Sequence, residues 1–223
     1  MSPSGDVARR PGALRLPGQV LLTCFDQFVR LSLKGVWVRG DIPSEPVVWA
    51  MNHHHWWDAF ASASVLRTRG QRPTALVSDR NLASFGVLNW IDAVPAGHSE
   101  RAEQLLRAGR TLIIMPEGRM MAPGPLGPLR GGAGRIAAKA EVPLVPVALR
   151  VVMRGSQHAE AFIDIGAPVR AEELAPALGQ ALRTMDDTLA TADPTLSLPG
   201  YRCVVTGRGS VDGWISVMTP WRR

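Results

Sequence analysis

The sequence predicts a single α/β domain with a mostly parallel central sheet, flanked by helices on both faces and preceded by an amphipathic helix. Two observations support this fold. Short apolar runs alternate with stretches of helical periodicity along the chain. The chain has 223 residues, enough to bury a sizeable core, and shows no internal repeat or long linker. We therefore expect one domain over residues 36–223.

The N-terminal segment differs from the rest in composition. Residues 1–12 are rich in Gly, Pro and Arg and are expected to be disordered, whereas 13–35 show helical periodicity. One face holds apolar residues and another holds charged ones: Leu21, Phe25, Phe28 and Val29 against Asp26, Arg30 and Lys34. Such a helix suits the lipid–water interface. Packing on the core explains the same periodicity equally well.

The remaining elements follow in order along the chain. The predicted strands are Val36–Arg39, Pro46–Met51, Thr74–Ser78, Ile91–Pro95, Thr111–Met115, Pro143–Val151 and Glu160–Ile165. The predicted helices are Trp57–Arg67, Glu100–Ala108, Gly132–Ala140 and Ala171–Ala190. Strands that alternate with helices in this way favour parallel pairing.

The charge balance limits the classes of partner that we expect. Lys and Arg exceed Asp and Glu by six, and a basic surplus attracts phosphate groups. The basic residues are scattered, so no nucleic-acid partner is expected; an Arg-rich composition without a functional meaning is the alternative. No run reaches the roughly 20 apolar residues of a membrane span, and Asp26 and Arg30 interrupt the one stretch that resembles a signal peptide. We expect the protein at the cytoplasmic face of a membrane.

A histidine cluster, Asn52–Asp58, directly follows the second predicted strand. If the chain turns into a helix there, the carboxylate of Asp58 reaches the ring of His53, fixes its tautomer and stabilises its protonated form. Adjacent histidines diverge and cannot share one ion, so we predict no metal site. A His-rich turn without a catalytic role is the other interpretation.

Two further blocks follow predicted strands or lead into one. Pro116-Glu117-Gly118 comes after Thr111–Met115, and Val142–Val147 contains Val-Pro-Leu-Val-Pro-Val. Together with Asn52–Asp58, and in this order, these blocks resemble those of the glycerolipid acyltransferase family, whose bacterial members acylate lysophosphatidic acid. The resemblance covers roughly residues 20–150.

The blocks depart from the family pattern at three places. Ile91–Gly97 lacks the Arg that usually ends the second block, Gly118 is followed by Arg119 instead of Thr-Arg, and His55 stands where Ser is common. These departures leave the acyl-transfer chemistry intact. They leave open whether the acceptor carries a phosphate.

The resemblance implies an enzyme, an O-acyltransferase with His53 as general base and Asp58 orienting it. The acyl donor would be acyl-CoA or acyl-carrier protein, the acceptor a lysophospholipid such as lysophosphatidic acid, and no bound cofactor is expected. Glu117, Gly118 and Arg119 are the predicted substrate-binding residues. Glu117 would contact the acceptor or hold Arg119; alternatively it caps the next turn.

Three further expectations complete the prediction. The membrane lipid surface is the expected partner, and Trp214, Trp221, Arg222 and Arg223 suit that interface. Trp56 and Trp57 are candidates to line an acyl channel, and the glycines at 131, 132 and 134 are interpreted as close helix packing. A neutral lipid, glycolipid or hydroxylated pigment acceptor, or a non-catalytic lipid-binding role, remains the alternative.

Overall fold

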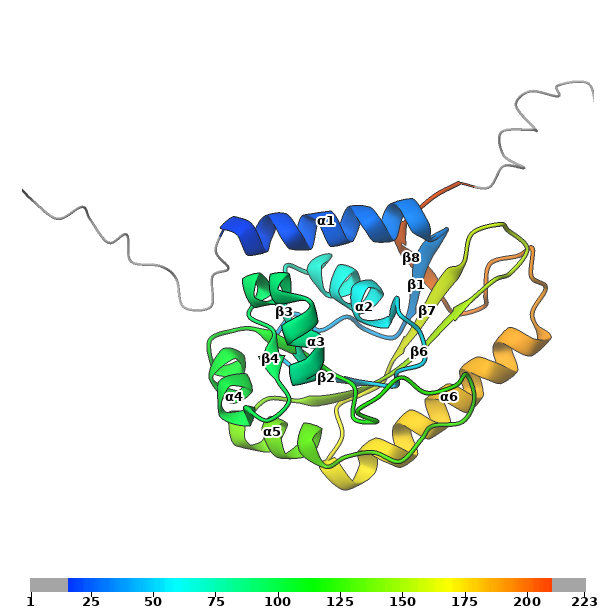
Figure 1. The fold of residues 1–223 in the computed structure, drawn as a ribbon. Helices are drawn as coiled ribbons and strands as arrows, with labels where there is room; N and C mark the ends of the chain where they lie inside the picture. The colour runs from blue at the N-terminus through cyan, green and yellow to red at the C-terminus, as the bar shows by residue number, and fades with distance from the viewer. Residues whose placement is uncertain (1–15, 210–223) are drawn as a thin grey trace, which may run out of the picture.

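The computed structural model describes residues 16–209, which form an eight-stranded sheet with helices on both faces (Figure 1). The strands are β1 Gly35–Arg39, β2 Val48–Met51, β3 Pro73–Val77, β4 Val94–Pro95, β5 Thr111–Ile114, β6 Leu144–Val152, β7 Glu160–Ile165 and β8 Arg202–Thr206. Their order is β4-β3-β5-β2-β6-β7-β1-β8. All pairs from β4 to β6 are parallel, as is β1 with β7, while β6–β7 and β1–β8 are antiparallel. The predicted single α/β domain with a mostly parallel sheet is confirmed.

The helices are α1 Leu16–Ser32, α2 Asp58–Arg67, α3 Asp79–Ser84, α4 Ser99–Arg107, α5 Gly132–Ala140 and α6 Leu174–Thr191, with 3₁₀ turns η1 Gly86–Ile91 and η2 Ala171–Glu173. Helices α1 and α2 cover one face of the sheet, and α4, α5 and α6 cover the other (Figure 1). Strand β2 shows why both faces need cover. Trp49 and Met51 join the core beneath α1 and α2, whereas Val48 and Ala50 point to α4 and α5.

The predicted strand Ile91–Pro95 is wrong over most of its length. Ile91 ends η1, and Asp92 adopts a left-handed conformation with φ of 57°. The Asp92 carboxylate lies 2.8 Å from the buried guanidinium of Arg110, which also donates to the carbonyl of Ile91. This contact turns the chain away from the sheet, so only Val94 and Pro95 pair with β3.

Strand β8 was not predicted. Its five residues include Arg202 and Thr206 and lack a clear apolar alternation, yet they pair antiparallel with β1 and form an edge of the sheet. The tryptophans and arginines predicted for the interface, Trp214 to Arg223, lie outside the described residues. So does segment 1–12, and both predictions stay predictions.

Helix α1 is present as predicted, but its faces differ from the prediction. Leu22 and Val29 are buried against the domain, whereas Phe28, assigned to the same face, is 44% exposed. The charged residues contact the protein: Asp26 accepts from Arg67 at 2.7 Å, and Lys34 pairs with Glu160 at 3.0 Å. Within residues 16–209, no helix has the length and apolar character to cross a bilayer.

Candidate active site

The segment that leaves β2 is fixed to the neighbouring strand by Asn52. Its amide oxygen accepts the N–H of Leu149 at 2.8 Å, and its amide nitrogen donates to the carbonyl of Leu149 at 3.0 Å. This pair of hydrogen bonds extends the β2–β6 contact by one residue beyond the strand. The histidines therefore begin at the carboxyl edge of the sheet, where α/β folds place ligands.

His53 and Asp58 meet as predicted, because the chain turns into α2 between them. Nδ1 of His53 lies 2.9 Å from Oδ2 of Asp58, which is fully buried at the first residue of α2. The same oxygen accepts the backbone N–H groups of His54 at 2.9 Å and His55 at 2.8 Å. These donors and the helix N-terminus stabilise the buried charge. A carboxylate only accepts, so Nδ1 of His53 carries the proton and Nε2 is left as a base.

The three histidine rings have different surroundings. The ring of His54 is buried, with Nδ1 2.7 Å from the amide nitrogen of Asn52 and 3.4 Å from the guanidinium of Arg150. Burial lowers the pKa of His54 to about 4, so this ring is neutral near pH 7. Nδ1 of His55 accepts the backbone N–H of Trp57 at 3.2 Å. Each ring thus has its own partner.

Glu117 connects the Pro-Glu-Gly block to the segment Asn52–Asp58. Its Oε2 accepts the backbone N–H of His53 at 2.7 Å, and its Oε1 accepts that of Gly127 at 2.9 Å. The carbonyl of His53 in turn accepts the N–H of Met121 at 2.7 Å. The Glu117 carboxylate, 7% exposed, thus contacts neither Arg119 nor the turn directly after it. It holds the main chain of His53; contact with substrate stays a prediction.

A cavity of about 640 Å³ opens beside His53. Its walls include Leu76 and Val77 of β3 and Ile113 and Ile114 of β5, which makes much of the lining apolar. Gly118 and Arg119 reach it as well, so three of the five predicted site residues line one cavity. The other two contact His53: Asp58 binds its ring and Glu117 binds its backbone N–H. Arg119 is exposed, and its Nε lies 3.4 Å from the sulfur of Met121.

Two other arginines, Arg130 and Arg135, line this cavity and were not predicted as site residues. The sequence feature that could have indicated Arg130 is its position directly before the Gly131-Gly132 pair at the start of α5. Of the three glycines interpreted as close helix packing, only Gly134 packs closely: an added Cβ would lie 2.4 Å from the Cβ of Ala171. Gly131 and Gly132 have open space around them and line the cavity instead.

Trp56 and Trp57 do not line the cavity. They belong to an aromatic cluster that connects the segment Asn52–Asp58 to α1. The ring of Phe28 lies 4.9 Å from that of Trp57 and 5.9 Å from that of Trp56, and Trp56 lies 4.5 Å from Phe60. The segment Asn52–Asp58 and α1 therefore pack as one unit.

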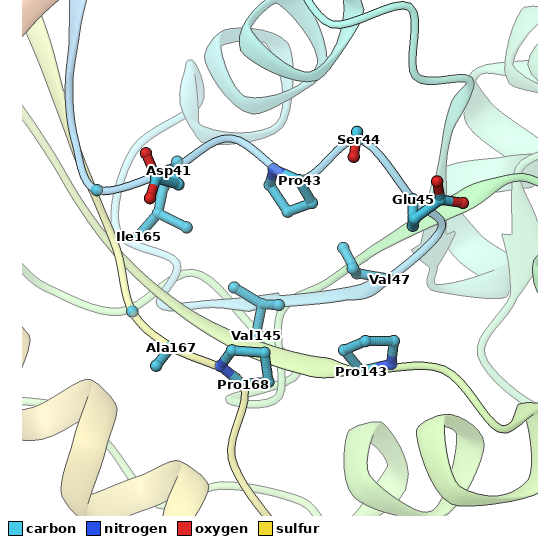
Figure 2. Close-up of a pocket in the computed structure, with 12 residues that line it drawn as sticks. Asp41, Pro43, Ser44, Glu45, Val47, Pro143, Val145, Ile165, Ala167 and Pro168 are labelled. Atoms are coloured by element: carbon cyan, nitrogen blue, oxygen red, sulfur yellow. The ribbon is translucent and has the colours of Figure 1, made fainter.

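A second cavity, of about 530 Å³, lies at the other end of β2, beside Val47 (Figure 2). The loop with Asp41 and Glu45 borders it on one side, and Pro143 and Pro168 border it on the other. It holds none of the predicted site residues. His53 follows the carboxyl end of β2, so the predicted site residues gather at the first cavity.

The comparison with known families agrees with these blocks. A family model described as Acyltransferase matches residues 36–150, just over half of the chain. The chain belongs to the acyltransferase family. The family predicted from the sequence blocks is thereby confirmed, and the matched region contains all three of them.

Two relatives resemble this acyltransferase. A chloroplastic 1-acyl-sn-glycerol-3-phosphate acyltransferase of Brassica napus is 27% identical over an alignment of 152 residues, and the match covers 58% of this chain and 43% of that protein. The chain thus matches less than half of the relative's length. The crystal structure of the 1-acyl-sn-glycerophosphate acyltransferase PlsC from Thermotoga maritima matches with a TM-score of 0.57 at 19% identity, covering 78% of this chain and 82% of that one. At that identity the likeness shows the fold.

Glu117→Gln tests the contact between the blocks. The amide offers one acceptor and places an N–H₂ group against a backbone N–H, so one charge-assisted hydrogen bond is lost. We expect the free energy of unfolding to fall by about 1.5–3 kcal/mol. Denaturant unfolding measures it, and wild-type stability would contradict the bracing role.

His54→Asn tests the buried neutral ring. In the wild type, the unfolded chain binds a proton at His54 near pH 6.5, while the folded chain binds it only near pH 4. This contribution to stability is complete above pH 6.5 and is lost as the pH falls towards 4. Asn keeps an acceptor for Asn52 but does not titrate.

Unfolding free energies of both proteins, measured at about pH 7 and about pH 5, isolate this effect from the other histidines. We expect the wild type to lose more stability over that interval than the variant. Equal losses would show that the His54 ring is protonated as easily in the folded state as in the unfolded one.

Proposed function

We propose that this protein is an O-acyltransferase that moves a fatty acyl group from acyl-CoA or acyl-carrier protein to the hydroxyl of a lysophospholipid such as lysophosphatidic acid. The observation that carries the proposal is the His53–Asp58 pair, held rigidly at the mouth of a cavity with apolar walls and arginines. The acyltransferase family and the substrates named for its two relatives support it.

The geometry supports direct transfer. Nε2 of His53 takes the proton of the acceptor hydroxyl as that oxygen attacks the thioester carbonyl, a base contribution of about 10²–10⁴-fold. Asp58 stabilises the imidazolium that forms. When the tetrahedral intermediate collapses, the thiolate leaves and takes the proton from His53. No acyl-enzyme is needed, since a base alone activates the hydroxyl.

A membrane surface is the source we propose for the acceptor, at its cytoplasmic face. Helix α1 has an outward apolar strip in addition to its buried side, formed by Leu16, Val20, Phe28 and Leu31, which are 73%, 54%, 44% and 65% exposed. The strip continues onto Trp56, 52% exposed, through the contact with Phe28. An apolar strip that ends in an indole ring beside the catalytic turn suits insertion at the head-group level.

His53→Ala tests the chemistry. It should abolish acyl transfer because it removes the base, while Asp58→Asn should lower kcat by disturbing the histidine tautomer. Transfer of radiolabelled acyl groups from acyl-CoA and from acyl-carrier protein measures both and identifies the donor. The matched control is His55→Ala, whose ring contacts only a backbone N–H in this turn. Turnover that survives His53→Ala would contradict the mechanism.

Leu31→Glu tests the membrane strip. Removing an apolar side chain that inserts into lipid costs about 1.5–3 kcal/mol, so co-sedimentation with phosphatidylglycerol vesicles should weaken by roughly tenfold or more. Leu196→Glu is the matched control, because Leu196 is a leucine of the same 65% exposure outside α1. Equal vesicle binding by the two variants would remove α1 from the membrane contact. Deletion of α1 is less informative, because Leu22 and Val29 belong to the core.

A further inference from the structure

The charges around the His53 cavity are of one sign. Arg119, Arg130 and Arg135 line it, and no Asp or Glu of the described part of the chain does. Among residues 16–209, no carboxylate forms an ion pair with any of the three. Elsewhere in the described domain arginines are commonly paired, as Arg39, Arg67 and Arg150 are. Three exposed guanidinium groups without an acidic partner give this cavity a positive potential, which favours an anionic ligand.

Arg130 has the most defined position of the three. Its backbone N–H donates to the carbonyl of Pro116 at 2.8 Å, which holds it beside the Pro-Glu-Gly block. Its guanidinium crosses directly over Gly118, where an added Cβ would lie 2.7 Å from Nε and 2.9 Å from Cζ. Gly118 also has φ of 73°, which favours glycine. The glycine of the Pro-Glu-Gly block therefore leaves room for Arg130.

The other groups at this end of the cavity add to the same field. Gly131 and Gly132 follow Arg130, open α5 and line the cavity with no side chain in the way. Arg135 lines it from the same helix. Arg119, by contrast, has its Nε directed at the sulfur of Met121. The positive potential thus concentrates around Arg130 and the start of α5.

We propose that Arg130, assisted by Arg135, forms a phosphate-binding subsite of the His53 cavity. The proposal rests on the proposed acyl transfer and names the substrate group that this side of the cavity holds. A guanidinium recognises phosphate through two parallel hydrogen bonds. The phosphate belongs either to the acceptor lipid or to the CoA donor, and both present the same chemistry. Specificity would then reside in an arginine outside the three sequence blocks.

Two soluble probes distinguish the sources: sn-glycerol 3-phosphate for the acceptor and adenosine 3′,5′-bisphosphate for the donor. Their affinities are measured by calorimetry on the wild type, Arg130→Gln, Arg135→Gln and, as control, Arg69→Gln. Arg69 is an exposed arginine outside the cavity lining, so its substitution changes net charge equally. We expect Arg130→Gln to weaken one probe by roughly 10- to 150-fold, the cost of a hydrogen bond to a charged group, and Arg135→Gln to weaken the same probe less.

Each outcome decides the question. A loss confined to sn-glycerol 3-phosphate supports the subsite with the acceptor as its source, and one confined to adenosine 3′,5′-bisphosphate supports it with the donor. If Arg130→Gln weakens neither probe more than Arg69→Gln does, the subsite is overturned. The His53→Ala turnover assay is independent of these affinities, so the subsite can fail while acyl transfer stands, and the reverse.

Discussion

A single buried oxygen, Oδ2 of Asp58, organises the active-site turn. It accepts the ring proton of His53 and the backbone N–H groups of His54 and His55, all within 2.9 Å. Taking a carboxylate out of water is costly unless donors surround the charge, so the turn must bring these three N–H groups to it. The path of the chain and the tautomer of the base therefore have one common cause. The geometry of the His53–Asp58 pair is a consequence of how α2 begins.

The second constraint is topological. The sheet order places β5 directly beside β2, so the blocks that follow these strands meet although 64 positions separate His53 from Glu117. Parallel pairing puts both carboxyl ends at one edge. The Glu117 carboxylate then holds two loops at once, through the N–H groups of His53 and Gly127. Its contacts explain why an acid serves here: both oxygens must accept, which an amide cannot do.

The sequence was informative where a pattern has a local cause. The His53–Asp58 contact follows from a five-residue spacing across a helix start, and the meeting of the blocks follows from strands that run the same way. The turn at Asp92 was not predicted because it depends on a contact with Arg110. That residue directly precedes β5 and lies 18 positions further along the chain. The position of Arg130 depends on the missing side chain of Gly118, and the neutrality of His54 on burial beside Arg150. These three features depend on packing between segments that are distant in the sequence, and the spacing of apolar residues along the chain does not reveal such packing.

Helix α1 has a buried apolar side and an exposed apolar side, and the packing of the buried side determines which residues the other side exposes. Leu22 and Val29 fix the helix to the domain, which leaves Leu16, Val20 and Leu31 facing outward. Phe28 stands between the two sides and touches both tryptophans of the catalytic turn. Under the proposed function, a bilayer that covers the outward strip also meets Trp56, two residues before Asp58. The aromatic contacts of Phe28, together with the buried side of α1, would then hold the lipid surface at a fixed distance from His53, and the arginine-lined cavity would receive the charged head group.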